Sequence, residues 1–172
     1  MAGEDGGGRE PAGFEVATGT GALPSGSDRE RAAAVRTAFE GLLQIRRLMN
    51  TGAAAPEGVP ADWERRRPVR AVALALEAAG IPPSATDPEG RRIATGYCVR
   101  AAEQAGVVRA DPAGVVRVEW LGPPGSGAAY AAHDELQGCV AVLRRLGWEA
   151  LEYRGPRGRR YLEVEPACPP PG

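Results

Sequence analysis

The chain contains no lysine, so all 21 of its basic residues are arginine. It also has a single histidine and few aromatic residues. A phosphate-binding P-loop needs a lysine, and the glycine-rich residues 122–127 supply none. The histidine, His133, stands beside Asp134 at a predicted helix start, where a capping or solvated role is more usual than general-base catalysis. We therefore expect no enzyme activity and no cofactor.

The cysteine and hydropathy patterns exclude further classes of protein. Cys98, Cys139 and Cys168 lie far apart and none forms a CxxC pair, so the sequence predicts no metal site. Cys139 falls among apolar positions and is predicted to be a small core residue. No apolar run reaches 18 residues, and the acidic, glycine-rich start lacks the apolar segment of a signal peptide. These absences predict a cytoplasmic protein with no membrane partner.

Composition divides the chain into three parts. Residues 1–26 are dominated by glycine, alanine and acids, and they are predicted to be disordered because they have little apolar surface to bury. Residues 27–166 are predicted to form a single α+β domain with a flexible linker at about 51–67. The proline-rich residues 167–172 are predicted to be a flexible tail.

Two segments in the first half show the helical spacing of apolar residues. The first is residues 28–49, which begin with a capping box formed by Ser27, just before the helix, and Glu30 in its first turn. The second begins at Pro68, which suits the first helical position, and stops at Gly80. Its apolar stripe comprises Val69, Val72, Ala73, Leu76 and Ala79.

A third helix leads directly into a β-hairpin. Its buried stripe comprises Leu136, Cys139, Val140, Leu143 and Leu146. Asp134 with Gln137 resembles a capping box, although the preceding AAYAA could extend the helix backwards. Gly147 suits a left-handed helix stop, after which Trp148 would pack on Leu143.

The hairpin is indicated by period-two alternation on both sides of a loop with glycine and proline. Symmetric closure opposes Tyr153 to Tyr161 and Leu151 to Glu163. The predicted core face then holds Trp148, Ala150, Leu162 and Val164.

The middle of the chain leaves alternatives open. A shift of 67 residues superposes the helix from Pro68, with its glycine stop, on the third helix, which indicates either an internal duplication or two helices with similar caps. Residues 91–105 fit a helix or a strand, and the alternation of Tyr97, Val99 and Ala101 favours the strand. A DPAG turn after residue 110 predicts another hairpin. Its core face would hold Val116, Val118 and Trp120.

These elements predict an α+β fold. We expect an N-terminal helix followed by an α-ββ-α-ββ core, with a small antiparallel sheet and helices on one of its faces.

Arginine clustering gives the candidate binding site. Residues 144–160 hold six arginines against two glutamates. An arginine-only composition, typical of a GC-rich genome, would give such a surface without any function. The functional hypothesis is an anion-binding edge on which tyrosines beside guanidinium groups stack against bases. Its predicted residues are Arg144, Arg145, Tyr153, Arg154, Arg157, Arg159, Arg160 and Tyr161.

The sequences LGW and GRRYLEVEP, together with the lack of lysine, carry a family resemblance. Over about residues 93–166 the chain resembles small uncharacterised α+β proteins of GC-rich actinobacteria, some of them encoded by mobile elements. This resemblance implies no particular site residues.

The leading functional hypothesis is a non-enzymatic interaction or regulatory module whose arginine-rich surface binds nucleic acid or an acidic protein. The alternative is a winged-helix transcription regulator, with residues 68–79 and 91–105 as its helix pair and the DPAG hairpin as its wing. A small enzyme is the third hypothesis.

The predicted burial of Leu143 beneath Trp148 can be tested directly. Leu143→Ala should lower the free energy of unfolding by about 2–5 kcal/mol, because it leaves a cavity in the core. Urea unfolding measures this change, and a loss below about 1 kcal/mol would show that the helix had been misplaced.

Overall fold

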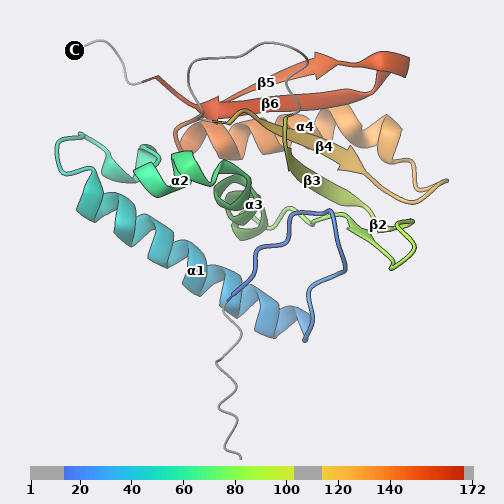
Figure 1. Ribbon diagram of the computed structural model, residues 1–172, viewed down its shortest axis with the longest axis horizontal. Coiled ribbons are helices and arrows are strands. Elements are labelled where there is room, and N and C mark those ends of the chain that lie inside the picture. The colour runs from blue at the N-terminus through green and yellow to red at the C-terminus, as the bar shows by residue number, and fades with distance from the viewer. Residues whose placement is uncertain (1–13, 103–113, 169–172) are drawn as a thin grey trace, which may run out of the picture.

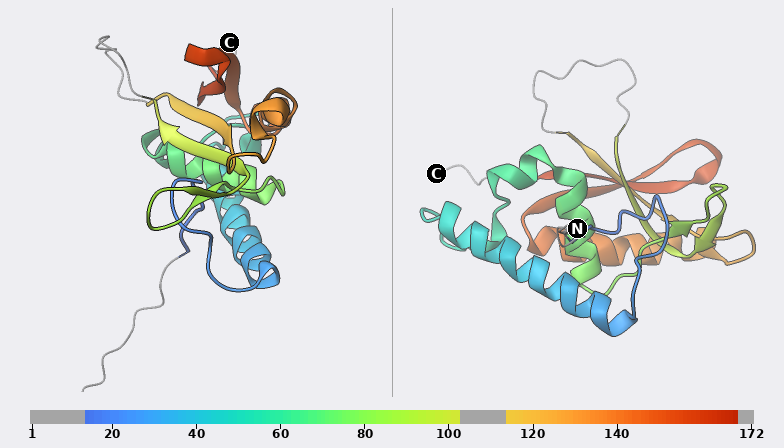
Figure 2. Two further views of the ribbon diagram at one scale, coloured as in Figure 1. Left: turned by 90° about the vertical axis from the view of Figure 1, so that its right-hand side faces the viewer. Right: turned by 60° about the horizontal axis from the view of Figure 1, so that its bottom comes forward.

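A four-stranded antiparallel sheet with strand order β3-β4-β6-β5 forms one layer of the fold. The computed structural model describes residues 14–102 and 114–168. Helices α3 and α4 pack on one face of the sheet, and α1 packs on α3 (Figures 1 and 2). The α+β prediction is therefore confirmed. The elements are α1 (Asp28–Met49), the 3-10 turn η1 (Pro56–Gly58), α2 (Asp62–Arg66), α3 (Pro68–Ala78), β1 (Ala85–Thr86), β2 (Arg92–Ala94), β3 (Gly96–Ala101), β4 (Val116–Leu121), α4 (Ala128–Arg145), β5 (Trp148–Arg154), the 3-10 turn η2 (Pro156–Gly158) and β6 (Arg160–Pro166).

The core lies between the sheet and the helices α3 and α4, because alternate strand residues point inward. Within the C-terminal hairpin, Tyr153 pairs with Tyr161 and Leu151 with Glu163, as the alternation predicted. The predicted core faces of the strands are buried, and Leu143 is fully buried with them. Their residues are Val116, Val118, Trp120, Trp148, Ala150, Leu162 and Val164.

Helices α3 and α4 both stop at a glycine in the left-handed conformation. After α3, Gly80 (φ 82°) and Ile81 donate to the carbonyls of Glu77 and Leu76 at 3.0 and 3.1 Å, which is a Schellman motif. Gly147 (φ 81°) ends α4. A Cβ atom there would lie 2.1 Å from the carbonyl oxygen of Gly58, so η1 packs where only glycine fits.

Each half of the core has a helix that ends at a glycine and is followed by strands. After Gly147 the chain enters β5 at once, whereas β1 and β2 intervene between Gly80 and β3. The 67-residue shift therefore matches the helices and their stops without matching the strands that follow.

The ambiguous residues 91–105 form strands where they are described. Both β2 and β3 are extended, and Tyr97 and Val99 of β3 enter the core, which confirms the favoured reading. Residues 103–105 lie outside the described residues. The helix pair of the winged-helix hypothesis is therefore absent from the described chain, because residues 92–94 and 96–101 are sheet.

The partner predicted for β4 is also corrected. β4 pairs with β3 along one edge and with β6 along the other, so β3 takes the place of the strand expected before the DPAG turn. That strand and residues 111–113 of the turn lie outside the described residues. A long-range pairing such as β4 with β6 leaves no local pattern to read.

Of the two helix starts left open, the one at Asp134 is wrong and the extension backwards through AAYAA is confirmed. α4 begins at Ala128, so the AAYAA segment is helical and His133 lies inside the helix. At the other end of the chain, the capping box of Ser27 and Glu30 opens α1 as predicted.

Residues 14–26 pack on the domain, so the predicted disorder is wrong for this part of the N-terminal segment. The Thr18 carbonyl accepts from the Val99 amide at 2.7 Å and the Ala17 carbonyl from the Tyr97 hydroxyl at 2.8 Å. Val16 packs against the core. The segment covers the free edge of β3 and so satisfies its backbone groups. Residues 1–13 lie outside the described residues.

The predicted flexible linker at 51–67 is instead built around a buried ion pair. It contains η1 and α2, and Glu64 of α2 binds Arg46 of α1 through two hydrogen bonds of 2.8 and 2.7 Å. The Arg46 guanidinium also donates to the carbonyls of Glu57 (2.6 Å) and Leu146 (2.7 Å). Both charged side chains are at most 1% exposed. One guanidinium thus joins α1, η1, α2 and the end of α4.

Breaking this pair should be far more damaging than replacing it. Glu64→Gln or Arg46→Met alone should lower the free energy of unfolding by about 3–5 kcal/mol, because each leaves a buried group without its partner. The double variant Arg46→Met with Glu64→Leu should be less destabilised than the sum of the single changes. Urea unfolding of all variants at neutral pH measures this. Single losses below about 1 kcal/mol would show that water reaches the pair.

Candidate functional site

The end of the β5-β6 hairpin brings four of the predicted arginines together. Arg154 and Arg160 are opposite each other in the last pair of the ladder, and Arg157 and Arg159 lie in the loop between them. The Gly155 amide donates to the Arg159 carbonyl at 2.7 Å and closes this loop. Arg157, Arg159 and Arg154 are exposed. The hairpin end therefore presents three solvent-facing guanidinium groups.

Arg157 has an unusual backbone conformation. With φ 62° it is, in the described ranges, the one non-glycine residue at positive φ. Glycine adopts this region without steric cost, whereas a side chain there is strained. The hairpin thus keeps an arginine where a glycine would fit better.

The predicted residues Arg144 and Arg145 lie elsewhere. They occupy the last turn of α4, and Arg144 donates to the Ala150 carbonyl at 3.3 Å. Ala150 is four residues before Arg154, a separation of about 13 Å along an extended strand. The predicted cluster is split because α4 runs back along β5, so the end of the helix lies beside the start of that strand.

The predicted tyrosine pair is confirmed as a cross-strand stack. The rings of Tyr153 and Tyr161 lie 5.8 Å apart at an interplanar angle of 22°. Arg117 of β4 lies over the Tyr161 ring, with its guanidinium carbon 4.0 Å from the ring centroid. Since Tyr161 belongs to the strand between β4 and β5, its ring is flanked on both sides. Tyr153, 41% exposed, is the tyrosine of this pair left to meet a base.

Arg117 was missed because its place beside Tyr161 depends on the pairing of β4 with β6. The alternation of β4 places Arg117 on the face of the strand that points away from the core. The sequence around Arg117 does not show which strand lies beside it on that face.

Arg160 differs from its neighbours because it is already paired. The Glu152 carboxylate accepts from Arg160 at 2.8 Å, from Gln137 at 2.7 Å, and lies 2.9 Å from Nδ1 of His133. Burial alone would raise the pKa of Glu152, but the hydrogen bonds from His133, Gln137 and Arg160 outweigh it and lower that pKa. His133 is therefore part of a structural network that fastens β5 and β6 to α4.

Charge on the outer sheet face is divided along the strands. At the end away from the hairpin loop, Glu149, Glu163 and Glu165 surround a small hollow beside Leu151 and Tyr153. The loop end carries the arginines. A polyanion lying across the whole face would meet the acids, so the basic contact surface is confined to the loop end.

A shallow hollow of about 310 Å³ marks the outer side of the loop. It is lined by Arg117, Glu119, Gly155, Pro156, Arg157, Arg159 and Tyr161. Its three arginines can hold an anion by charge and hydrogen bonds, whereas Glu119 would repel one. Across residues 14–102 and 114–168, no three histidine, cysteine or acidic side chains gather closely enough to hold a metal ion.

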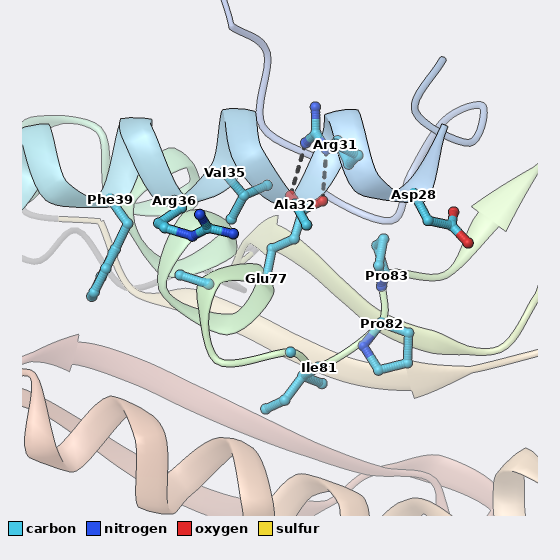
Figure 3. A pocket seen from close by; sticks show the side chains of 12 residues that line it. Asp28, Arg31, Ala32, Val35, Arg36, Phe39, Glu77, Ile81, Pro82 and Pro83 are labelled. Carbon is cyan, nitrogen blue, oxygen red and sulfur yellow. Dashed lines mark hydrogen bonds and ion pairs between the residues drawn. The ribbon is translucent and has the colours of Figure 1, made fainter. Parts of the chain in front are cut away.

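A second kind of hollow lies between α1 and the turn after α3 (Figure 3). Its charged groups are Asp28, Arg31, Arg36 and Glu77. Arg31 and Glu77 neutralise each other through hydrogen bonds of 2.7 and 2.8 Å. Phe39 and Ile81 contribute apolar surface. One of its two arginines, Arg31, is therefore already paired with a carboxylate, and the lining holds as many acidic as basic side chains.

The Glu152 network predicts a pH dependence of stability. Its folded pKa lies below the ordinary value of 4.5, so the charged carboxylate stabilises the fold above that pH, and the stabilisation is lost as the pH falls through the folded pKa. At about pH 7, Glu152→Gln should lower the free energy of unfolding by about 1 kcal/mol. Urea unfolding near pH 7 and pH 3 should show the difference shrinking in acid. A difference independent of pH would contradict the network.

Three comparisons with known proteins bear on the identity of the chain. The chain matches no protein-family model, and neither the curated proteins nor the solved structures contain a significant match. Among the described residues, no helix has the length and apolar character needed to cross a bilayer. The actinobacterial resemblance over about residues 93–166 stays an expectation. The case for a function therefore depends on the geometry and charge of the hairpin end.

Proposed function

We propose that the chain is a non-enzymatic interaction module that binds the phosphate backbone of nucleic acid through its hairpin end. The observation that carries this proposal is the set of exposed arginines Arg154, Arg157 and Arg159 at the end of one hairpin. The guanidinium groups of Arg157 and Arg159 have no hydrogen-bond or ion-pair partner among the described residues. Unpaired guanidinium groups at a protruding loop can approach a phosphate backbone without entering a groove.

Binding by this loop should depend on charge more than on base stacking. Tyr161 is flanked by Tyr153 and Arg117, so a base could not lie on its ring without displacing one of them. One stacking position, at Tyr153, remains beside the arginines. The proposal thus implies strong salt dependence and little sequence preference.

The proposal is tested by replacing the loop arginines. The variant Arg157→Ser with Arg159→Ser is compared with a control, Arg29→Ser with Arg145→Ser, which changes the net charge equally at exposed positions outside the loop. Fluorescence anisotropy gives affinities for a single-stranded and a duplex oligonucleotide over a series of salt concentrations. Circular dichroism confirms that each variant folds.

The loop variant should flatten the plot of log affinity against log salt. Each lost phosphate contact reduces the slope by about 0.7 on a single strand and about 0.9 on a duplex. The control should keep the wild-type slope. If the wild type binds neither oligonucleotide at about 50 mM salt, where such attraction is strong, nucleic acid is not the partner. Equal effects of the loop and control variants would show that only overall charge matters.

A further inference from the structure

We infer that a further hollow, which lies behind the hairpin loop and is larger than the one on its outer side, binds a terminal phosphate monoester. This inference deepens the proposed function, since it names the group that the same end of the molecule would select. The hollow measures about 500 Å³, within the range of sites for small ligands. It is lined by Arg92, Arg100, Glu119, Trp120, Leu121, Gly122, Ala128, Ala129, Ala132, Arg157, Gly158, Arg159 and Arg160.

The hollow lies where the pairing of β6 with β4 stops before the end of β4. β3 pairs with β4 as far as Leu121, whereas the pairing of β6 with β4 ends at Glu119. The last residues of β4 therefore have no strand on that side. The hairpin loop and the first turns of α4 border the gap, so segments far apart in the sequence meet around it.

The lining is strongly basic, with five arginines and one glutamate. The guanidinium groups of Arg157 and Arg159 have no partner among the described residues, and Arg160 is neutralised by Glu152. Arg92 is held by neutral acceptors: it donates to the Gly19 carbonyl, to Ser84 Oγ at 3.0 Å and to Cys98 Sγ at 3.6 Å. Its guanidinium is thus fixed in position while its charge stays uncompensated by these contacts. An anion entering the hollow would relieve the repulsion between these like charges.

The start of α4 adds backbone donors to the same wall. Gly127 precedes the helix and its first turn has no acidic residue. Its first amide, that of Ala128, donates a long hydrogen bond of 3.4 Å to Ser126 Oγ, in place of the capping box that Ser27 makes on α1. Ala128 and Ala129 line the hollow with side chains too small to keep an anion from the helix end. Trp120, 7% exposed, also lines it, and its indole Nε1 is buried without a partner in the described part of the chain.

A monoester fits this arrangement better than a backbone diester. Donors come from the loop, from Arg92 beside β3 and from α4, so they approach from several sides. A terminal phosphate has three free oxygens and about two negative charges, whereas a diester exposes two oxygens and one charge. Arg157 has a strained backbone conformation and lines the hollow. The strain therefore lies at a residue that such a ligand would contact.

The phosphate could belong to the end of a nucleic-acid strand or to a small phosphorylated compound. Three probes separate these sources: inorganic phosphate, an oligonucleotide with a 5′-phosphate, and the same oligonucleotide with a 5′-hydroxyl. Affinities come from anisotropy with a label at the 3′ end, and inorganic phosphate is followed by calorimetry.

The decisive variants place a carboxylate inside or just outside the hollow. Ala129→Glu introduces a negative charge at the lining, at a first-turn helix position where glutamate favours folding. Tyr130→Glu adds the same charge one residue later, at a side chain that is 97% exposed and not part of the lining. Arg157→Gly removes a lining arginine and relieves the positive-φ strain, so its melting temperature should not fall.

We expect the wild type to bind the 5′-phosphorylated strand at least tenfold more tightly than the 5′-hydroxyl strand. Ala129→Glu and Arg157→Gly should remove most of this preference, and Tyr130→Glu should keep it. Equal affinity of the wild type for both strands, with binding intact, would overturn the inference and leave the proposed function standing. If neither strand binds, the proposed partner fails. Calorimetry with inorganic phosphate then decides. Binding to the wild type and Tyr130→Glu but not to Ala129→Glu would assign the hollow to a small phosphate ester. If inorganic phosphate does not bind the wild type either, the inference is overturned as well.

Discussion

The rest of the structure depends on the buried pair of Arg46 and Glu64. A charge in the interior is tolerated only with a partner and a full set of hydrogen bonds, and this guanidinium obtains them from three further segments of the chain. Its bond to the Leu146 carbonyl reaches the point where α4 gives way to β5. α1, η1 and α2 therefore cannot shift independently of the sheet. The tight approach of η1 to Gly147 follows from the same arrangement.

The sheet has two faces with different roles. Apolar residues on one face pack under α3 and α4, while the other face carries charges and the stacked tyrosines. The Glu152 network ties the outer half of the hairpin to α4 and so determines where the loop arginines stand relative to the helix start. Stability and the candidate site are thereby linked, because Arg160 serves the network while Arg157 and Arg159 face solvent.

The basic region is small and local in spite of the many arginines in the chain. Several arginines elsewhere are neutralised, as Arg31 is by Glu77 and Arg91 by Asp87. Acidic residues occupy the far end of the outer face. What distinguishes the hairpin end is the excess of guanidinium groups over carboxylates around a hollow, together with a strained arginine where glycine would be unstrained. Such a gathering costs folding free energy, and an anionic ligand would offset that cost.

Local patterns in the sequence determined the helices, their glycine stops and the register of the C-terminal hairpin, since each depends on neighbours within a few residues. They also identified the stacked tyrosines and the loop arginines. They could not place Arg144 apart from Arg157, or Arg117 over Tyr161, because those positions follow from the path of α4 and from the pairing of β4 with β6. The order seen in residues 14–26 and in η1 and α2 was likewise decided by tertiary contacts: weakly apolar segments gain order when the domain supplies partners for their backbone and for one buried charge.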